Sequence, residues 1–104
     1  MKLYSKRFPF ADAPETMCFT CCHVLNDKEP VLYISHDEDG FRQFLCGRNH
    51  TEDEARIVSL AEMLEIDKSV AKFADLKRGE YAEYCNGSWF VQKNNNFRIE
   101  KTQL

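Results

Sequence analysis

Residues 31–46, with the sequence VLYISHDEDGFRQFLC, decide the fold of this chain. The two halves of this segment, 31–36 and 41–46, are both rich in the β-branched and aromatic residues that are typical of strands. Asp39-Gly40 lies between them and favours a tight hairpin turn, because glycine adopts a positive φ without steric cost. The segment therefore predicts two antiparallel strands joined by a short turn.

The sequence before this hairpin predicts one more strand. Residues 16–25 are rich in Thr, Phe, Val and Cys and contain neither Gly nor Pro, which favours a strand. The polar segment 26–30 ends in proline and is typical of a turn. We therefore expect a three-stranded antiparallel meander. Residues 1–16 contain two prolines and are expected to form an irregular arm, anchored to the core by Phe8 and Phe10.

The segment after the hairpin allows two interpretations. Thr51-x-x-Glu54 is a capping box that would open one long helix ending at residue 66, and Ser59-x-x-Glu62 is an equally good capping box. We favour a strand at 56–58 followed by a helix at 60–66. The remaining predicted elements are a helix at 68–74 capped by Asp67, strands at 80–85 and 88–92 around an Asn86-Gly87 turn, and a last strand or ordered tail at 97–99.

These elements predict one α+β domain over residues 1–104. Its antiparallel sheet would have five or six strands and pack against one or two short helices. The length of 104 residues suits a single domain, and 43% hydrophobic with 30% charged residues is ordinary for a globular protein. A net charge of −3 without a basic stripe disfavours nucleic acid as a partner. Without a long apolar run or a signal-peptide h-region, we expect a cytoplasmic protein with no membrane contact.

Five cysteines give the chain its most distinctive chemistry. Because zinc prefers thiolate and imidazole ligands, a candidate set consists of Cys18, Cys21, Cys46 and His50. Cys18 and Cys21 lie in a predicted strand, however, and strand alternation would point them to opposite faces. No Gly or Pro forms a knuckle there. The other interpretation is that these are buried, inert thiols and that the protein has no cofactor.

Catalysis by a cysteine is a further alternative. Cys46 could be paired with His23, His36 or His50, but a thiol enzyme also needs an orienting group and an oxyanion hole. No motif indicates these, and the Cys-x-x-Cys spacing is not expected at a strand-to-helix junction that would activate a thiol for redox work. We therefore expect no catalytic residues and a protein that is not an enzyme.

Two surface features favour binding to another protein. Asp37, Glu38 and Asp39 form an acidic cluster that suits a basic partner, although solvated acidic loops are common. Trp89 is the only tryptophan and lies on the predicted C-terminal hairpin among other aromatic residues. Aromatic residues of this kind supply much of the binding energy at interfaces. The candidate partner-binding residues are therefore these three acids and Trp89.

The central part of the chain also resembles a known group of proteins. The segments HVL at 23–25, PVLY at 30–33 and HDEDGFRQFLCG at 36–47 resemble small bacterial proteins related to the immunity proteins of polymorphic toxin systems. Phe41 stands where that group commonly has a tryptophan. The resemblance implies a small α+β fold and a non-catalytic role in binding another protein. A basic toxin is one candidate for that partner. It supplies no catalytic residues.

Overall fold

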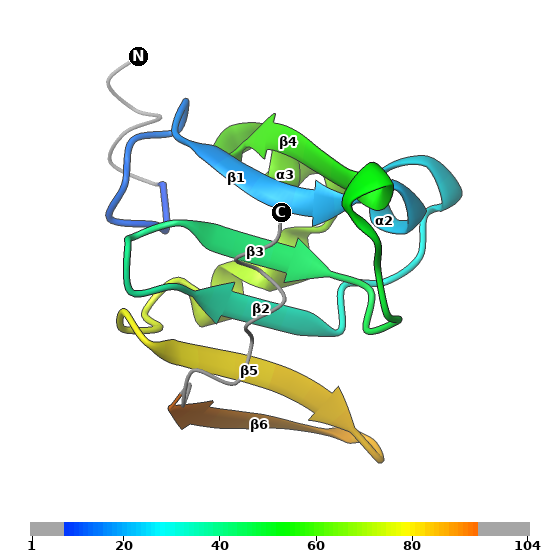
Figure 1. Cartoon of the computed structure of the whole chain (residues 1–104). Coiled ribbons are helices and arrows are strands. Elements are labelled where there is room, and N and C mark those ends of the chain that lie inside the picture. Colours follow the sequence, from blue (N-terminus) through cyan, green and yellow to red (C-terminus); the bar gives the residue numbers. More distant parts are fainter. Residues whose placement is uncertain (1–7, 94–104) are drawn as a thin grey trace.

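A computed structural model describes residues 8–93, which form a six-stranded open sheet with short helices. The strand order is β4-β1-β3-β2-β5-β6, and only the β1–β3 pair is parallel (Figure 1). The expected α+β single domain is confirmed. The elements are β1 (Met17–Cys21), α2 (Cys22–Asp27), β2 (Tyr33–His36), β3 (Arg42–Leu45), η1 (Glu52–Glu54), β4 (Ala55–Ser59), α3 (Leu60–Ile66), η2 (Lys68–Phe73), β5 (Glu80–Cys85) and β6 (Ser88–Lys93).

The strand expected at 16–25 is shorter than its composition predicts. It ends at Cys21, and α2 begins at the next residue. The helix buries Val24, which is 1% exposed, and ends at Asp27, where the next residue, Lys28, caps it with a left-handed φ of 58°. Burial of an apolar face stabilises most short helices in proteins and here outweighs the strand preference of Thr, Val and Cys.

The predicted meander is wrong in its first strand. Strands β2 and β3 form the expected antiparallel hairpin, but β1 pairs with β3 instead of β2, as a parallel neighbour with Phe19 opposite Gln43. Parallel neighbours need a crossover connection. Here α2 and the turn after it carry the chain past β3 to β2, so β1 and β3 end at the same edge of the sheet (Figure 1).

Both capping boxes in the ambiguous segment are present. Thr51 and Glu54 close the single 3₁₀ turn η1, and Ser59 and Glu62 open α3. The preferred interpretation, a strand followed by a helix at 60–66, is confirmed by β4 and α3. The next helix, η2, is 3₁₀ rather than α, and the Asp67 side chain caps it by accepting a hydrogen bond from the Ser69 amide.

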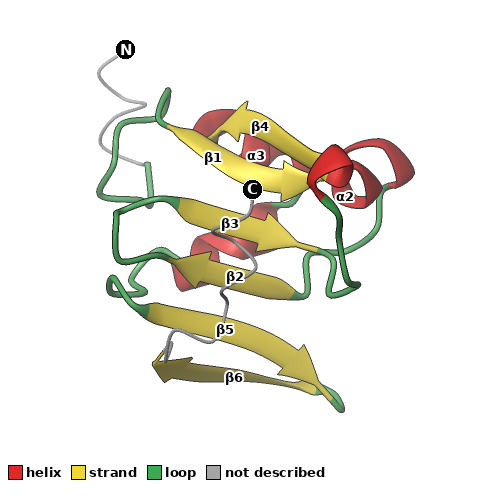
Figure 2. Cartoon of the chain, in the orientation of Figure 1, coloured by secondary structure: helices red, strands yellow, loops and turns green. Residues whose placement is uncertain are grey.

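The core lies between the sheet and the helices α3 and η2, which lie behind the sheet in Figure 2. Phe44 at its centre is fully buried, and Phe10 meets it edge-on at 6.1 Å between ring centroids. Phe8 packs against the same core, so the described part of the N-terminal arm is anchored as expected.

The predicted element at 97–99 lies outside the described residues. Within residues 8–93, every helix is too short to cross a bilayer.

Candidate metal centre

Four side chains with metal-ligating atoms meet at one corner of the sheet. Cys21 ends β1, His23 lies in the first turn of α2, Cys46 directly follows β3, and His50 lies in the loop after it. One ligand atom from each residue lies within 4.8 Å of the other three. Two thiols and two imidazoles form a donor set that is typical of structural zinc sites.

The parallel pairing of β1 and β3 brings the two cysteines together. Because Thr20 lies opposite Phe44 and both strands run the same way, Cys21 and Cys46 come at the same end of two neighbouring strands. In an antiparallel meander, β2 would have lain between β1 and β3 and kept the ends of these two strands apart. The sheet topology, rather than the Cys-x-x-Cys spacing, therefore builds the thiol pair.

Each histidine reaches the thiols through a local change of chain direction. At Cys21 the backbone passes from extended to helical, which carries His23 back toward the sheet edge. Gly47 has a φ of 95°, a left-handed conformation that turns the chain after β3 and returns His50 to the same corner. The His23 and His50 rings lie 5.4 Å apart between centroids.

The distances at Cys46 suit a bound zinc ion. Its Sγ lies 3.6 Å from His23 Nδ1 and 3.4 Å from His50 Nε2. Tetrahedral zinc, with bonds of about 2.3 Å to sulfur and about 2.0–2.1 Å to nitrogen, would place such a ligand pair about 3.6 Å apart. The thiols are the inner wall of the site, since Cys21 is 0% and Cys46 4% exposed. Both histidines are half-buried.

Burial shifts the pKa values of His50 and Cys46 at this corner of the sheet. It lowers the pKa of His50, an effect that His23 and Arg48 reinforce and Glu54 opposes. It also raises the pKa of Cys46, while the backbone at Arg48 acts in the opposite direction. A neutral imidazole is ready to ligate, whereas the buried thiol must release a proton when a cation arrives.

Glu54 supports the cluster from the adjoining turn. One of its carboxylate oxygens, Oε2, lies 3.9 Å from His23 Nε2, and the other accepts a hydrogen bond from the Thr51 amide at 3.2 Å. Histidines that ligate a metal usually donate their second ring N–H to a carboxylate or carbonyl, which fixes the tautomer. Glu54 is therefore placed to turn Nδ1 of His23 toward the thiols.

The structure groups the predicted metal ligands differently from the sequence. Cys21, Cys46 and His50 come together, but Cys18 lies outside the group and His23 takes the fourth place. Cys18 is 1% exposed in the core, and burial raises its pKa to about 12. The sequence does place His23 just after the cysteines. That position indicates a ligand only once the strand is known to end at Cys21 and a helix to follow.

The same corner bears on the thiol-enzyme alternative. Contrary to expectation, the end of the Cys-x-x-Cys segment does lie at a strand-to-helix junction, between Cys21 and Cys22. Cys46 contacts two of its proposed histidine partners, whereas His36 instead pairs with the Leu76 carbonyl at 2.8 Å. Burial raises the pKa of Cys46, which makes this thiol a poor nucleophile, because the thiolate is the reactive form.

The candidate partner-binding residues separate into buried and exposed groups. Asp37 is only 5% exposed and accepts hydrogen bonds from the Ser35 hydroxyl at 3.0 Å and the Gln43 amide at 2.9 Å. It belongs to a buried polar network, not to the acidic surface that the sequence predicted. Glu38 and Asp39 remain exposed.

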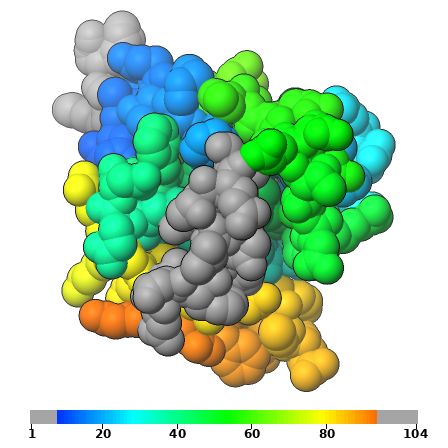
Figure 3. Space-filling view, in the orientation of Figure 1, coloured from blue at the N-terminus to red at the C-terminus, as the bar shows by residue number. Residues whose placement is uncertain are grey.

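Trp89 is half-buried rather than free on the surface. Its ring lies 4.6 Å from Phe73 and 5.5 Å from Tyr84, measured between centroids. The more exposed apolar residues of the β5–β6 hairpin are Tyr84, Phe90 and Val91. Strand β6 lies along the lower border of the face seen in Figure 3.

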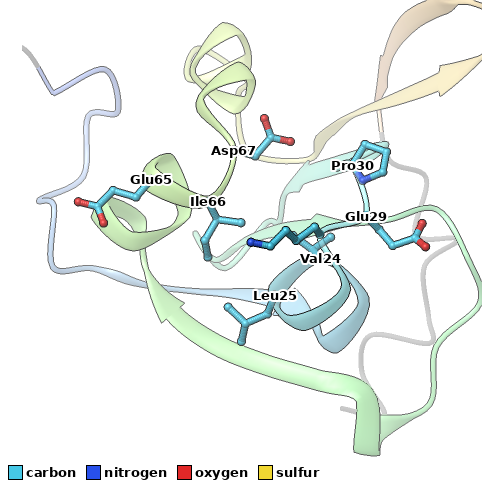
Figure 4. Close-up of a pocket in the computed structure, with 8 residues that line it drawn as sticks. Val24, Leu25, Glu29, Pro30, Glu65, Ile66 and Asp67 are labelled. Atoms are coloured by element: carbon cyan, nitrogen blue, oxygen red, sulfur yellow. The ribbon is translucent and has the colours of Figure 1, made fainter.

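A separate cavity of about 280 Å³ lies beside α2. Its walls come from α2, the turn that follows it and the end of α3 (Figure 4). Apolar side chains and charged groups both line it, and none of the four clustered residues does. The lining residues are Val24, Leu25, Lys28, Glu29, Pro30, Glu65, Ile66 and Asp67.

The fold and the side-chain cluster together define a small α+β domain with a candidate Cys₂His₂ metal centre. No protein family, curated protein or solved structure matches the chain. The resemblance to immunity proteins therefore stays a prediction, and the chemistry of the centre is argued from its own geometry.

Proposed function

We propose that this protein is a zinc-binding domain, with one Zn²⁺ held by Cys21, His23, Cys46 and His50. The observation that carries the proposal is the pair of sulfur-to-nitrogen distances at Cys46, 3.6 and 3.4 Å. These are close to the separation of about 3.6 Å that tetrahedral zinc imposes on its ligands. Two soft thiolates also disfavour Mg²⁺ and Ca²⁺, which prefer oxygen.

A role in stability follows from the number of ligands. Four protein ligands leave no open position for water or substrate, which is the arrangement of structural rather than catalytic zinc. The ion would join the ends of β1 and β3 to α2 and to the loop that carries His50. Because the unfolded chain has no preformed site, the free energy of metal binding would add to that of folding.

The test is a zinc titration of protein purified without metal-affinity resin, with stoichiometry measured by elemental analysis. We expect one zinc per chain for the wild type and for Cys85→Ala, a matched control at an exposed thiol. Cys46→Ala should lose the bound zinc. Retention of one zinc by Cys46→Ala, or a metal-free wild type in excess zinc, would contradict the proposal. Circular dichroism of each variant verifies that it is folded.

A second candidate function is binding to a protein partner through the β5–β6 hairpin. It is favoured by the exposure of three large apolar side chains there: 40% for Tyr84, 49% for Phe90 and 52% for Val91. Among the strands of residues 8–93, β6 is also the outermost on its side of the sheet. Phe90 lies on the other face of the hairpin from Tyr84 and Val91, so the feature they share is the sheet edge, and edge strands are common sites of association. Glu38 and Asp39 would favour a basic partner.

This second candidate is tested by comparing two matched surface variants. A partner is first enriched on the wild-type chain, and its Kd is then measured for Phe90→Ser and for Ile57→Ser. Ile57 is a suitable control because it is 61% exposed on β4, at the opposite edge of the sheet. Weakened binding for Phe90→Ser alone is expected. Equal Kd values for the two variants would exclude the hairpin as the contact.

A further inference from the structure

His23 belongs to two groups of metal-ligating residues. Besides the four-residue centre, Cys22, His23 and Glu54 also have ligand atoms within 4.8 Å of one another. The two ring nitrogens of His23 face different residues. Nδ1 lies 3.6 Å from Cys46 Sγ, and Nε2 lies 3.9 Å from Glu54 Oε2. The imidazole therefore stands between an inner and an outer ligand set.

The two sets differ in exposure. The inner thiols, Cys21 and Cys46, are 0% and 4% exposed, whereas Cys22 is half-buried and the Glu54 side chain is 33% exposed. A hydrated ion approaching from solvent would meet a carboxylate and a thiol before it could reach the buried sulfurs. A carboxylate attracts the cation and a thiolate binds it strongly.

We infer that Cys22 and Glu54 form the entry site for the zinc ion, through which it reaches and leaves the inner centre. This inference rests on the proposed function. The Cys22 thiol releases a proton to solvent as its sulfur binds Zn²⁺. The Cys21 and Cys46 thiols would then replace the Cys22 sulfur on the ion and lose two protons, one to Cys22 and one to solvent, so that uptake of one Zn²⁺ would release two protons in all. The ion stays Zn²⁺, so the exchange needs no oxidant or reductant.

This role affects rates rather than affinity. Cys22 is not among the four final ligands, so removing it leaves the bound state unchanged. Because release retraces the path of uptake, a lost entry ligand slows both directions by the same factor and leaves Kd unaltered. Glu54 also orients His23, so Glu54 variants change affinity as well. Cys22 therefore gives the cleaner test.

The experiment is stopped-flow measurement of zinc uptake and of zinc release to a fluorescent chelator. The variants are Cys22→Ala and the control Cys85→Ala. Alanine suits the first turn of α2 because it is a good helix former. We expect Cys22→Ala to slow both rates about tenfold, which corresponds to a barrier about 1.4 kcal/mol higher. Its Kd and its single bound zinc should match the wild type.

Three outcomes would overturn the inference while leaving the proposed function intact. These are wild-type rates in Cys22→Ala, a change in Kd without a matching change in both rates, and two zinc ions per wild-type chain. The last would make the outer set a second permanent site. A wild type that binds no zinc would instead defeat the proposed function itself, so the two failures are distinguishable.

Discussion

The two ends of strand β1 carry chemically identical side chains in different surroundings. Cys18 lies in the core, near enough to Arg42 and Glu62 to be influenced by both charges, and burial raises its pKa to about 12. Cys21 is equally buried, but it lies at the junction with α2 and faces Cys46 and two histidines. Burial alone therefore does not distinguish a core thiol from a ligand.

The difference follows from where the strand ends. Alternation along β1 points Cys18 and Cys21 to opposite faces of the sheet. Both cysteines belong to the buried cluster of the core, but only Cys21 is followed directly by a helix, which places His23 beside it. The comparison suggests that the partners a cysteine meets, rather than its spacing from another cysteine, decide its role.

The largest effect is expected on the stabilisation by zinc, when Cys21 rather than Cys18 is replaced by alanine. Zinc at roughly 1,000 times its Kd should stabilise the wild type by about 4 kcal/mol. Cys21→Ala should lose this zinc-dependent gain, whereas Cys18→Ala should keep it despite the cavity it leaves in the core. Chemical denaturation with and without zinc measures the gain within each variant. An undiminished gain in Cys21→Ala would reverse the assignment of the two thiols.

A smaller effect is expected at the outer edge of the ligand cluster. Glu54→Gln removes the charge that faces His23 Nε2 and should weaken zinc binding by roughly 10–100-fold, the usual range for such supporting groups. Competition with a chelator of known affinity gives the Kd. Glu65→Gln is a matched control, because Glu65 is an exposed acid on α3 that lies outside the candidate ligand groups. A Kd equal to that of the control would show that Glu54 does not support His23.

The last prediction concerns Cys18, toward the other end of the strand, where only a small effect is expected just above pH 9. The pKa of Cys18 is raised from 9.0 to about 12 by burial, so the folded chain keeps this proton when the unfolded chain has lost it. The contribution to stability is complete below pH 9 and is lost as the pH rises from 9 through about 12. Denaturation of the metal-free protein should therefore show a steeper alkaline decline for the wild type than for Cys18→Ala. Parallel declines would argue that Cys18 ionises normally when folded.

Turn chemistry made most of the fold predictable. Asp39-Gly40 and Asn86-Gly87 are local signals, since each glycine adopts a positive φ that the turn requires, and both hairpins are observed. The Ser59-x-x-Glu62 capping box likewise fixed the start of α3. Such signals involve neighbouring residues only, so they need no knowledge of the tertiary structure.

The sequence was less informative where tertiary contacts determine the secondary structure and the strand pairing. The helix α2 has only six residues and depends on the burial of Val24, so residues 16–25 were predicted to be one strand. The parallel pairing of β1 with β3 depends on the path of the whole crossover. Both errors concealed His23 as a ligand, although Cys21, Cys46 and His50 were already candidates. Asp37 was misplaced because one of its partners, Gln43, is brought to it only by the hairpin register, which places Gln43 opposite Ser35.

X-ray absorption spectroscopy of the zinc-loaded protein is the most direct test of the central claim, because it separates sulfur ligands from nitrogen or oxygen ligands and recognises imidazole by its ring atoms. The account predicts two sulfurs at about 2.3 Å and two nitrogens at about 2.0–2.1 Å from the ion. Cys18→Ala should give the same shell, while Cys21→Ala should not. A shell with three sulfurs, or one made mainly of oxygen, would contradict a centre built from Cys21, His23, Cys46 and His50.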